Sequence, residues 1–121
     1  ARRPISVRTA AVPLAVVASR SHNTPETEAY IRDLGAAEIV SVGSSLKFCL
    51  LASAEADVYP RFGRTMEWDT AAGDAVLRAA GGTTRTLDGK LLAYGKRDQA
   101  DDEDFANPHF IASGRAGANP V

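Results

Sequence analysis

The chain of 121 residues is long enough for one modest domain with a hydrophobic core. Its 45% apolar and 24% charged residues are typical of an ordinary globular protein. A formal net charge of −1 favours neither a nucleic acid polymer nor an anionic membrane as partner, and no apolar run approaches the ~20 residues of a membrane span. The single cysteine, Cys49, excludes an internal disulfide and suits a reducing compartment, so we predict a cytoplasmic location.

The first residues do not predict a signal peptide, because two arginines are followed by no apolar stretch. The chain also begins without an initiator methionine, which predicts processing or an internal start. We expect an N-terminal segment with the first strand at 1–12, one α/β domain at 13–114, and a flexible tail rich in Gly, Ala and Pro at 115–121.

Hydrophobic periodicity divides the chain into alternating strands and helices, which predicts an α/β architecture of a layered sheet with flanking helices. The predicted strands cover 5–8, 14–19, 38–42, 57–60, 83–87, 91–94 and 110–113. The predicted helices cover 24–34, 45–54 and 70–80.

The predicted helices carry local start and stop signals. Thr24 supplies a capping hydroxyl and Pro25 stands at the first helical position of the first helix. Asp69 caps the third helix, and Gly81 ends it. The residues expected on the buried faces of the second and third helices are Leu46, Cys49, Leu50, Ala72, Val76 and Ala79.

Two further segments are predicted to be turns or loops. Asp88-Gly89 is a hairpin turn pair between the strands at 83–87 and 91–94. The acidic run 98–104 lacks the glycine and the spacing of a calcium-binding loop, which favours a solvated loop.

Asp69 allows two interpretations that are compatible with each other. As a helix cap, its side chain would accept a backbone N–H of the first turn. As a metal ligand, one carboxylate oxygen would coordinate while the other caps. The small residues Ala71, Ala72 and Gly73 would let an ion or a phosphate approach the helix N-terminus, where free N–H groups favour anions.

Two junctions after predicted strands are candidates for ligand binding. Ser19 and His22 follow the strand at 14–19, where open α/β sheets bind ligands, although a plain loop with a surface histidine fits equally well. Gly43 and Lys47 stand at the start of the second helix and could hold a phosphate; a simple serine cap with an exposed lysine is the alternative. Arg61, in the loop after another strand, adds a further cation and favours one convergent polar cleft.

Four stretches together resemble a known enzyme family. They are S-R-S-H at 19–22, G-S-S-L-K-F-C at 43–49, D-V-Y-P-R-F-G at 57–63 and M-E-W-D-T-A-A-G at 66–73, followed by G-G at 81–82. The pattern resembles the CysQ-type 3′(2′),5′-bisphosphate nucleotidases of the inositol monophosphatase superfamily. The resemblance covers about 14–114 and implies the C-terminal half of an αβαβα sandwich like that of inositol monophosphatase and fructose bisphosphatase.

The resemblance also implies a reaction and a set of site residues. Enzymes of this type hydrolyse 3′-phosphoadenosine 5′-phosphate to AMP and phosphate, with Mg²⁺ orienting water and polarising the scissile phosphate. Asp69 would be a Mg²⁺ ligand and would also contact the substrate. The nucleotide contacts implied are Ser19, His22, Gly43 and Lys47, and the charge of Arg61 adds it to the substrate-binding set.

The family's other metal-binding motifs, a Glu-Glu pair and D-P-x-D-G-T, do not occur in this chain. We therefore expect it to be inactive without an N-terminal half, supplied in the same chain or in a separate one. Two alternatives stay open. One is an inositol monophosphatase-like sugar phosphatase, and the other is a non-catalytic chain completed by a separate N-terminal chain.

Overall fold

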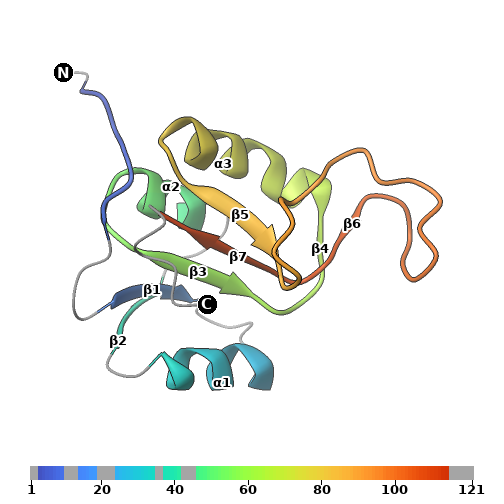
Figure 1. Ribbon diagram of the computed structural model, residues 1–121, viewed down its shortest axis with the longest axis horizontal. Helices are drawn as coiled ribbons and strands as arrows, with labels where there is room; N and C mark the ends of the chain where they lie inside the picture. The colour runs from blue at the N-terminus through green and yellow to red at the C-terminus, as the bar shows by residue number, and fades with distance from the viewer. Residues whose placement is uncertain (1–2, 10–13, 19–23, 35–36, 42–45, 115–121) are drawn as a thin grey trace.

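The computed structural model describes residues 3–9, 14–18, 24–34, 37–41 and 46–114 (Figure 1). The helices are α1 (Pro25–Asp33), α2 (Leu46–Ala52) and α3 (Glu67–Ala79). The strands are β1 (Leu14–Ala18), β2 (Ala37–Ser41), β3 (Val58–Arg61), β4 (Thr65–Met66), β5 (Thr83–Thr86), β6 (Ala106–Asn107) and β7 (Phe110–Ser113).

The main sheet has five strands in the order β2-β1-β3-β7-β5. β1 runs parallel to β2 and β3, whereas β7 pairs antiparallel with both β3 and β5. The carboxyl ends of the three parallel strands therefore lie at one edge. From β1 the chain crosses to β2 on one side, and from β3 it continues toward β7 and β5 on the other. The edge between β1 and β3 is thus a topological switch point, where open α/β sheets bind ligands.

The helices cover the two faces of this sheet, with α2 and α3 on one face and α1 on the other (Figure 1). β4 and β6 form a separate two-stranded ladder beside the N-terminal end of α3. These layers confirm the predicted α/β architecture. No helix among the described residues is long and apolar enough to cross a membrane.

The core between the sheet and α2 is aromatic. Phe48 of α2 stands edge-on to Tyr59 of β3, with ring centroids 5.3 Å apart, and stacks on Phe110 of β7 at 5.9 Å. Phe48 and Phe110 are almost fully buried. Three rings from three elements thus fix α2 over the centre of the sheet.

The predicted first strand at 5–8 is wrong, because this segment pairs with no strand of the described sheet. It is held as an extended strap instead. The backbone N–H of Val7 donates to the carbonyl oxygen of Ala80 at 3.0 Å. The guanidinium of Arg8 binds both carboxylate oxygens of the buried Asp57, at 2.8 and 2.9 Å. A bidentate pair on a buried carboxylate supplies the order that strand pairing does not.

The predicted buried face of α3 is wrong, and that of α2 is correct only for Leu50, which is partly buried and packs against the core. Leu46 is 59% exposed and Cys49 and Leu50 are half-buried, whereas Lys47, Phe48, Leu51 and Ala52 are buried. On α3, Ala72, Val76 and Ala79 are exposed, and the buried residues are Glu67, Thr70, Gly73, Asp74 and Leu77. The buried face of α3 includes polar residues, and several of its apolar residues lie on the exposed face. A prediction from the apolar residues alone therefore selected the exposed face of the helix.

Several boundaries also differ from the prediction. Asp88-Gly89 does form a turn, and Gly89 has φ +85° as such a turn requires. After it, however, only an isolated bridge joins Arg85 and Leu91, so the strand predicted at 91–94 is wrong. The helix cap at Thr24 and the last strand at 110–113 are confirmed. The acidic run 98–104 lies outside helices and strands and is mostly exposed, as expected.

Candidate functional site

The candidate site lies where β3 ends and α2 and α3 begin. Ser19, His22 and Gly43 lie outside the described residues, so their predicted roles stay predictions. Of the remaining candidates, Arg61 is the last residue of β3, Lys47 is in the first turn of α2, and Asp69 is in the first turn of α3. These three come from three different elements, and Tyr59 of β3 interacts with each of them.

Lys47 is buried rather than exposed, with only 5% of its surface accessible. Its ammonium lies 5.7 Å from the centre of the Tyr59 ring, a distance at which the ring face attracts a cation. Burial, together with the positive charge of Arg61, lowers the pKa of Lys47. The alternative of a merely exposed lysine is therefore wrong, and the side chain is directed into the protein beside Arg61.

Arg61 has a buried donor without an acceptor among the residues that the structure describes. Its Nε is shielded from solvent and has no hydrogen-bond partner in the described part of the protein. A buried donor without a partner costs about 1–3 kcal/mol. An anion delivered to this position would remove that cost, so Arg61 is suited to bind one.

Tyr59 links the three charged groups electrostatically, and the sequence analysis did not select it. Burial raises the pKa of its hydroxyl, the charge and a hydrogen bond of Arg61 act against that rise, and the charge of Asp69 adds to it. Arg61 and Asp69 thus act in opposite directions on the pKa of the same hydroxyl group. The signal available in the sequence was the alternation of β3, which places Tyr59 and Arg61 on the same face.

Asp69 is not the N-cap of its helix, contrary to the prediction. The helix begins two residues earlier, at Glu67, and the N-cap is Met66. Asp69 is the third helical residue, and its Oδ2 accepts a hydrogen bond from the backbone N–H of Met66 at 2.9 Å. This is the return half of a capping box, in which the third residue satisfies the N–H of the cap. The capping interpretation holds in this altered form.

Asp69 is suited to be one ligand of a magnesium ion, but the described residues do not supply a complete set of ligands. Asp69 is exposed, and only one of its carboxylate oxygens has a hydrogen bond in the described structure. A hard cation such as Mg²⁺ prefers such oxygen ligands. However, no group of three or more His, Cys, Asp or Glu side chains that could hold a metal ion occurs among the described residues.

Behind the site, α3 is fixed to the sheet by a buried carboxylate that the sequence analysis missed. Asp74 is 1% exposed and accepts hydrogen bonds from the hydroxyl of Thr84 at 2.6 Å and of Tyr94 at 2.8 Å. Arg78, one helical turn later, adds an ion pair at 2.9 Å. Both carboxylate oxygens of Asp74 thus accept from donors of other elements or turns, so this polar group can be buried.

Comparison with known proteins shows the family of this chain. Residues 3–116 match the inositol monophosphatase family. The chain is 66% identical over 85 residues to an uncharacterized protein in the pss 5′ region of Rhizobium leguminosarum bv. phaseoli, a match covering 70% of this chain and 90% of that protein.

Two better-described relatives are longer. The chain is 49% identical over 112 residues to the 3′(2′),5′-bisphosphate nucleotidase CysQ of Escherichia coli strain K12, a match covering 93% of this chain and 43% of that enzyme. The crystal structure of CysQ from Bacteroides thetaiotaomicron, a bacterial member of the inositol monophosphatase family, superimposes with a TM-score of 0.73 at 51% identity. That match covers 84% of this chain and 37% of the other.

The chain thus spans less than half the length of the CysQ proteins it matches. Within the aligned parts, which cover 93% and 84% of this chain, about half of the residues are identical to those of the two CysQ proteins. The chain belongs to the inositol monophosphatase family.

Proposed function

We propose that this chain is part of a Mg²⁺-dependent 3′(2′),5′-bisphosphate nucleotidase that hydrolyses 3′-phosphoadenosine 5′-phosphate to AMP and phosphate. The substrate class is suggested by the similarity to CysQ of Escherichia coli, which bears the name of that activity. The chain alone supplies only part of such an enzyme, and a cytoplasmic location belongs to the same proposal.

The observation that carries the proposal is the convergence of two cations on one buried position. Lys47 and Arg61 are near enough for the charge of Arg61 to lower the pKa of Lys47, an effect second to burial. The Nε of Arg61 is buried without an acceptor within the described structure. Two like charges held together in this way are stabilised by a bound anion, and a phosphate group supplies several acceptor oxygens at once.

The remaining site residues have roles proposed by family resemblance. Ser19, His22 and Gly43 would contact the nucleotide together with Lys47. Asp69 would hold one oxygen toward Mg²⁺ and the substrate while the other accepts from Met66. The ion, when bound, supplies charge stabilisation for the phosphate. Its other ligands would come from an N-terminal half, because the described residues offer too few.

A direct test compares the chain alone with the complete enzyme on 3′-phosphoadenosine 5′-phosphate. We expect no turnover by the purified chain with Mg²⁺, and turnover when an N-terminal half is present. Turnover by the chain alone, above a metal-free control, would overturn the predicted inactivity. Hydrolysis of inositol phosphates but not of the nucleotide by the complete enzyme would favour the sugar phosphatase alternative.

A second test addresses the anion site. Arg61→Met in the complete enzyme removes the unsatisfied donor and its charge while keeping a side chain of similar length. We expect KM for the bisphosphate nucleotide to rise at least about tenfold, as loss of a charge-assisted hydrogen bond implies. Arg97→Met, at an exposed arginine just before the acidic run 98–104, is the matched control and should leave KM unchanged.

A further inference from the structure

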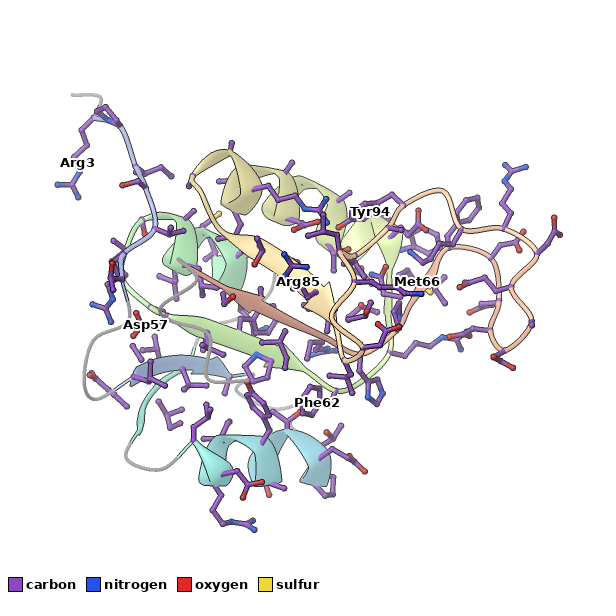
Figure 2. All side chains as sticks on the ribbon, viewed as in Figure 1. Arg3, Asp57, Phe62, Met66, Arg85 and Tyr94 are labelled. Carbon is purple, nitrogen blue, oxygen red and sulfur yellow. The ribbon has the colours of Figure 1, made fainter. Side chains whose placement is uncertain are left out.

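The first turn of α3, which carries Asp69, is tied to a neighbouring loop and to β6 by a cluster of three residues. Glu67 is the first residue of α3, Lys96 belongs to the loop that follows the hairpin turn, and Asn107 ends β6. We call these three residues the Glu67 clamp. None of them was selected as a candidate from the sequence. Figure 2 labels two residues beside this cluster, Met66 at the start of α3 and Tyr94 in the segment after the hairpin turn, and the Lys96 ammonium lies 5.5 Å from the centre of the Tyr94 ring.

Glu67 is fully engaged by this loop. Its Oε1 accepts the backbone N–H of Gly95 at 2.7 Å, and its Oε2 accepts the backbone N–H of Lys96 at 3.0 Å and the Lys96 ammonium at 2.8 Å. The side chains of Glu67 and Lys96 are only 11% and 17% exposed. Three charge-assisted hydrogen bonds in so enclosed a position hold both partners in one geometry.

Asn107 extends the clamp to the two residues on either side of the helix start. Its Oδ1 accepts from the Lys96 ammonium at 3.2 Å, and its Nδ2 donates to the hydroxyls of Thr65 at 3.1 Å and Thr70 at 3.0 Å. Thr65 precedes the helix and Thr70 lies in its second turn. One amide group therefore fixes the chain both before and after Asp69.

Met66, the donor to Asp69, is fixed by the same surroundings. It pairs with Ala106 in the β4–β6 ladder, and the next residue, Glu67, donates its backbone N–H to the carbonyl oxygen of Phe105 at 2.8 Å. The N–H of Met66 then reaches Asp69 Oδ2 at 2.9 Å. The direction of that N–H, and with it the orientation of the carboxylate, depends on where the clamp holds Met66 and the helix start.

We propose that the Glu67 clamp is a positioning device for the Asp69 carboxylate, so that Glu67, Lys96 and Asn107 set the geometry of the proposed active site without touching the substrate. The expected effect of the clamp on catalysis rests on the function proposed above. The positioning of the Asp69 carboxylate by the clamp does not depend on that function. Loss of the Lys96 side chain removes the only ammonium that bridges Glu67 and Asn107 in the described structure. The loop then stays attached to Glu67 only through the backbone N–H groups of residues 95 and 96 among the described contacts of that carboxylate.

The test compares Lys96→Met and Glu67→Gln with Thr84→Val in the complete enzyme. Thr84 binds Asp74 on the same helix and has no contact with the clamp or with Met66 among the described hydrogen bonds, so it is the control for stability alone. The first readout is the amide proton shift of Met66 in the metal-free protein, observed by NMR. The second readout is the Mg²⁺ concentration that gives half-maximal activity. It is compared with kcat at saturating Mg²⁺, which separates weaker Mg²⁺ binding from slower catalysis.

We expect both clamp variants to shift the Met66 amide signal. We also expect Lys96→Met to raise the half-saturating Mg²⁺ concentration about tenfold, as is usual when a partner that orients a metal ligand is lost, with a smaller change in kcat. Thr84→Val should lower the melting temperature without either effect. An unchanged Met66 signal in both clamp variants overturns the proposal, since it shows that the clamp is structural only. That outcome does not depend on activity, so it is distinct from failure of the proposed nucleotidase function.

Discussion

Gly73 of α3 and Phe48 of α2 are in direct contact: a Cβ added to Gly73 would lie 2.8 Å from Phe48 Cδ2 and 3.0 Å from its Cβ. Real side chains do not approach so closely, and the Phe48 ring cannot retreat because Tyr59 and Phe110 pack against it. The absence of a side chain at this position therefore sets the separation of the two helices. It also sets the distance between Lys47 on α2 and Asp69 on α3.

Gly73→Ala should accordingly disturb both stability and the candidate site. Forcing a methyl group into a filled contact costs about 1–3 kcal/mol, and the better helix propensity of alanine offsets about 1 kcal/mol of this. We therefore expect the free energy of unfolding to fall by up to about 2 kcal/mol in urea denaturation. KM for the bisphosphate nucleotide should rise as α2 moves away from α3. Ala79→Ser, at an exposed position of α3, is the control and should change neither quantity. Stability above the wild-type value in Gly73→Ala, as helix propensity alone would give, would contradict the close packing.

Asp69→Asn should remove most activity of the complete enzyme and weaken its Mg²⁺ dependence, because an amide is a poorer ligand for a hard cation than a carboxylate. Folding should survive, since the amide oxygen can still accept the N–H of Met66. Activity titrated against Mg²⁺, with circular dichroism for the fold, measures both. Activity that persists at the wild-type Mg²⁺ concentration would leave Asp69 with its capping role alone.

Lys47→Ala and His22→Ala should affect nucleotide selection more than the chemical step. Both residues are proposed to bind the substrate in its ground and transition states alike, and loss of such binding raises KM while kcat is kept. We expect KM for the bisphosphate nucleotide to rise. The ratio of kcat/KM for the nucleotide to kcat/KM for inositol phosphates should fall. Kinetics on both substrates decide between the possibilities. Equal losses would indicate a general phosphate or folding role, and no loss would exclude both residues from the site.

Asp74→Leu should destabilise the fold strongly, since it leaves the buried hydroxyl of Thr84 without its acceptor and Arg78 without its ion pair. Removing one partner of a buried pair costs about 3–5 kcal/mol, and the partial exposure of Arg78 favours the lower end of that range. The measurement is the free energy of unfolding in urea. Asp88→Asn, in the exposed pair with Lys90, is the matched control and should have no measurable effect.

Glu67 should make the stability of the protein depend on pH in acid. Burial opposes its ionisation, but the hydrogen bonds of Lys96 and of the Gly95 backbone prevail and lower the pKa of Glu67 to about 2. Because the folded-state pKa lies below the ordinary value of 4.5, its contribution is complete above about pH 4.5 and is lost as the pH falls toward 2. Unfolding free energies at pH 6 and pH 3 measure this loss. Glu67→Gln should reduce the difference between the two pH values, and an unchanged difference would contradict the assignment.

Local signals in the sequence were enough to predict the helices, strands and turns that are determined by neighbouring residues. Thr24 and Pro25 define the start of α1 because the cap hydroxyl and the fixed proline φ act within one turn. The apolar run of β1 and the Asp88-Gly89 turn are likewise decided by neighbouring residues. The motifs around Lys47 and Asp69 were sufficient to place the chain in its family, since they combine residue type with spacing over nearly the whole chain.

What the sequence by itself determined was therefore the α/β architecture, the family and three of the groups at the described site. Only the tertiary structure decided which face of α2 and α3 is buried. A polar residue such as Asp74 or Glu67 can be buried only when partners arrive from elsewhere, and Thr84, Tyr94 and Lys96 are distant in the chain. The sequence could not predict the burial of Lys47 or the Nε of Arg61 without an acceptor in the described structure. Burial and hydrogen-bond satisfaction depend on the neighbours that pack around a residue and not on its own position in the sequence.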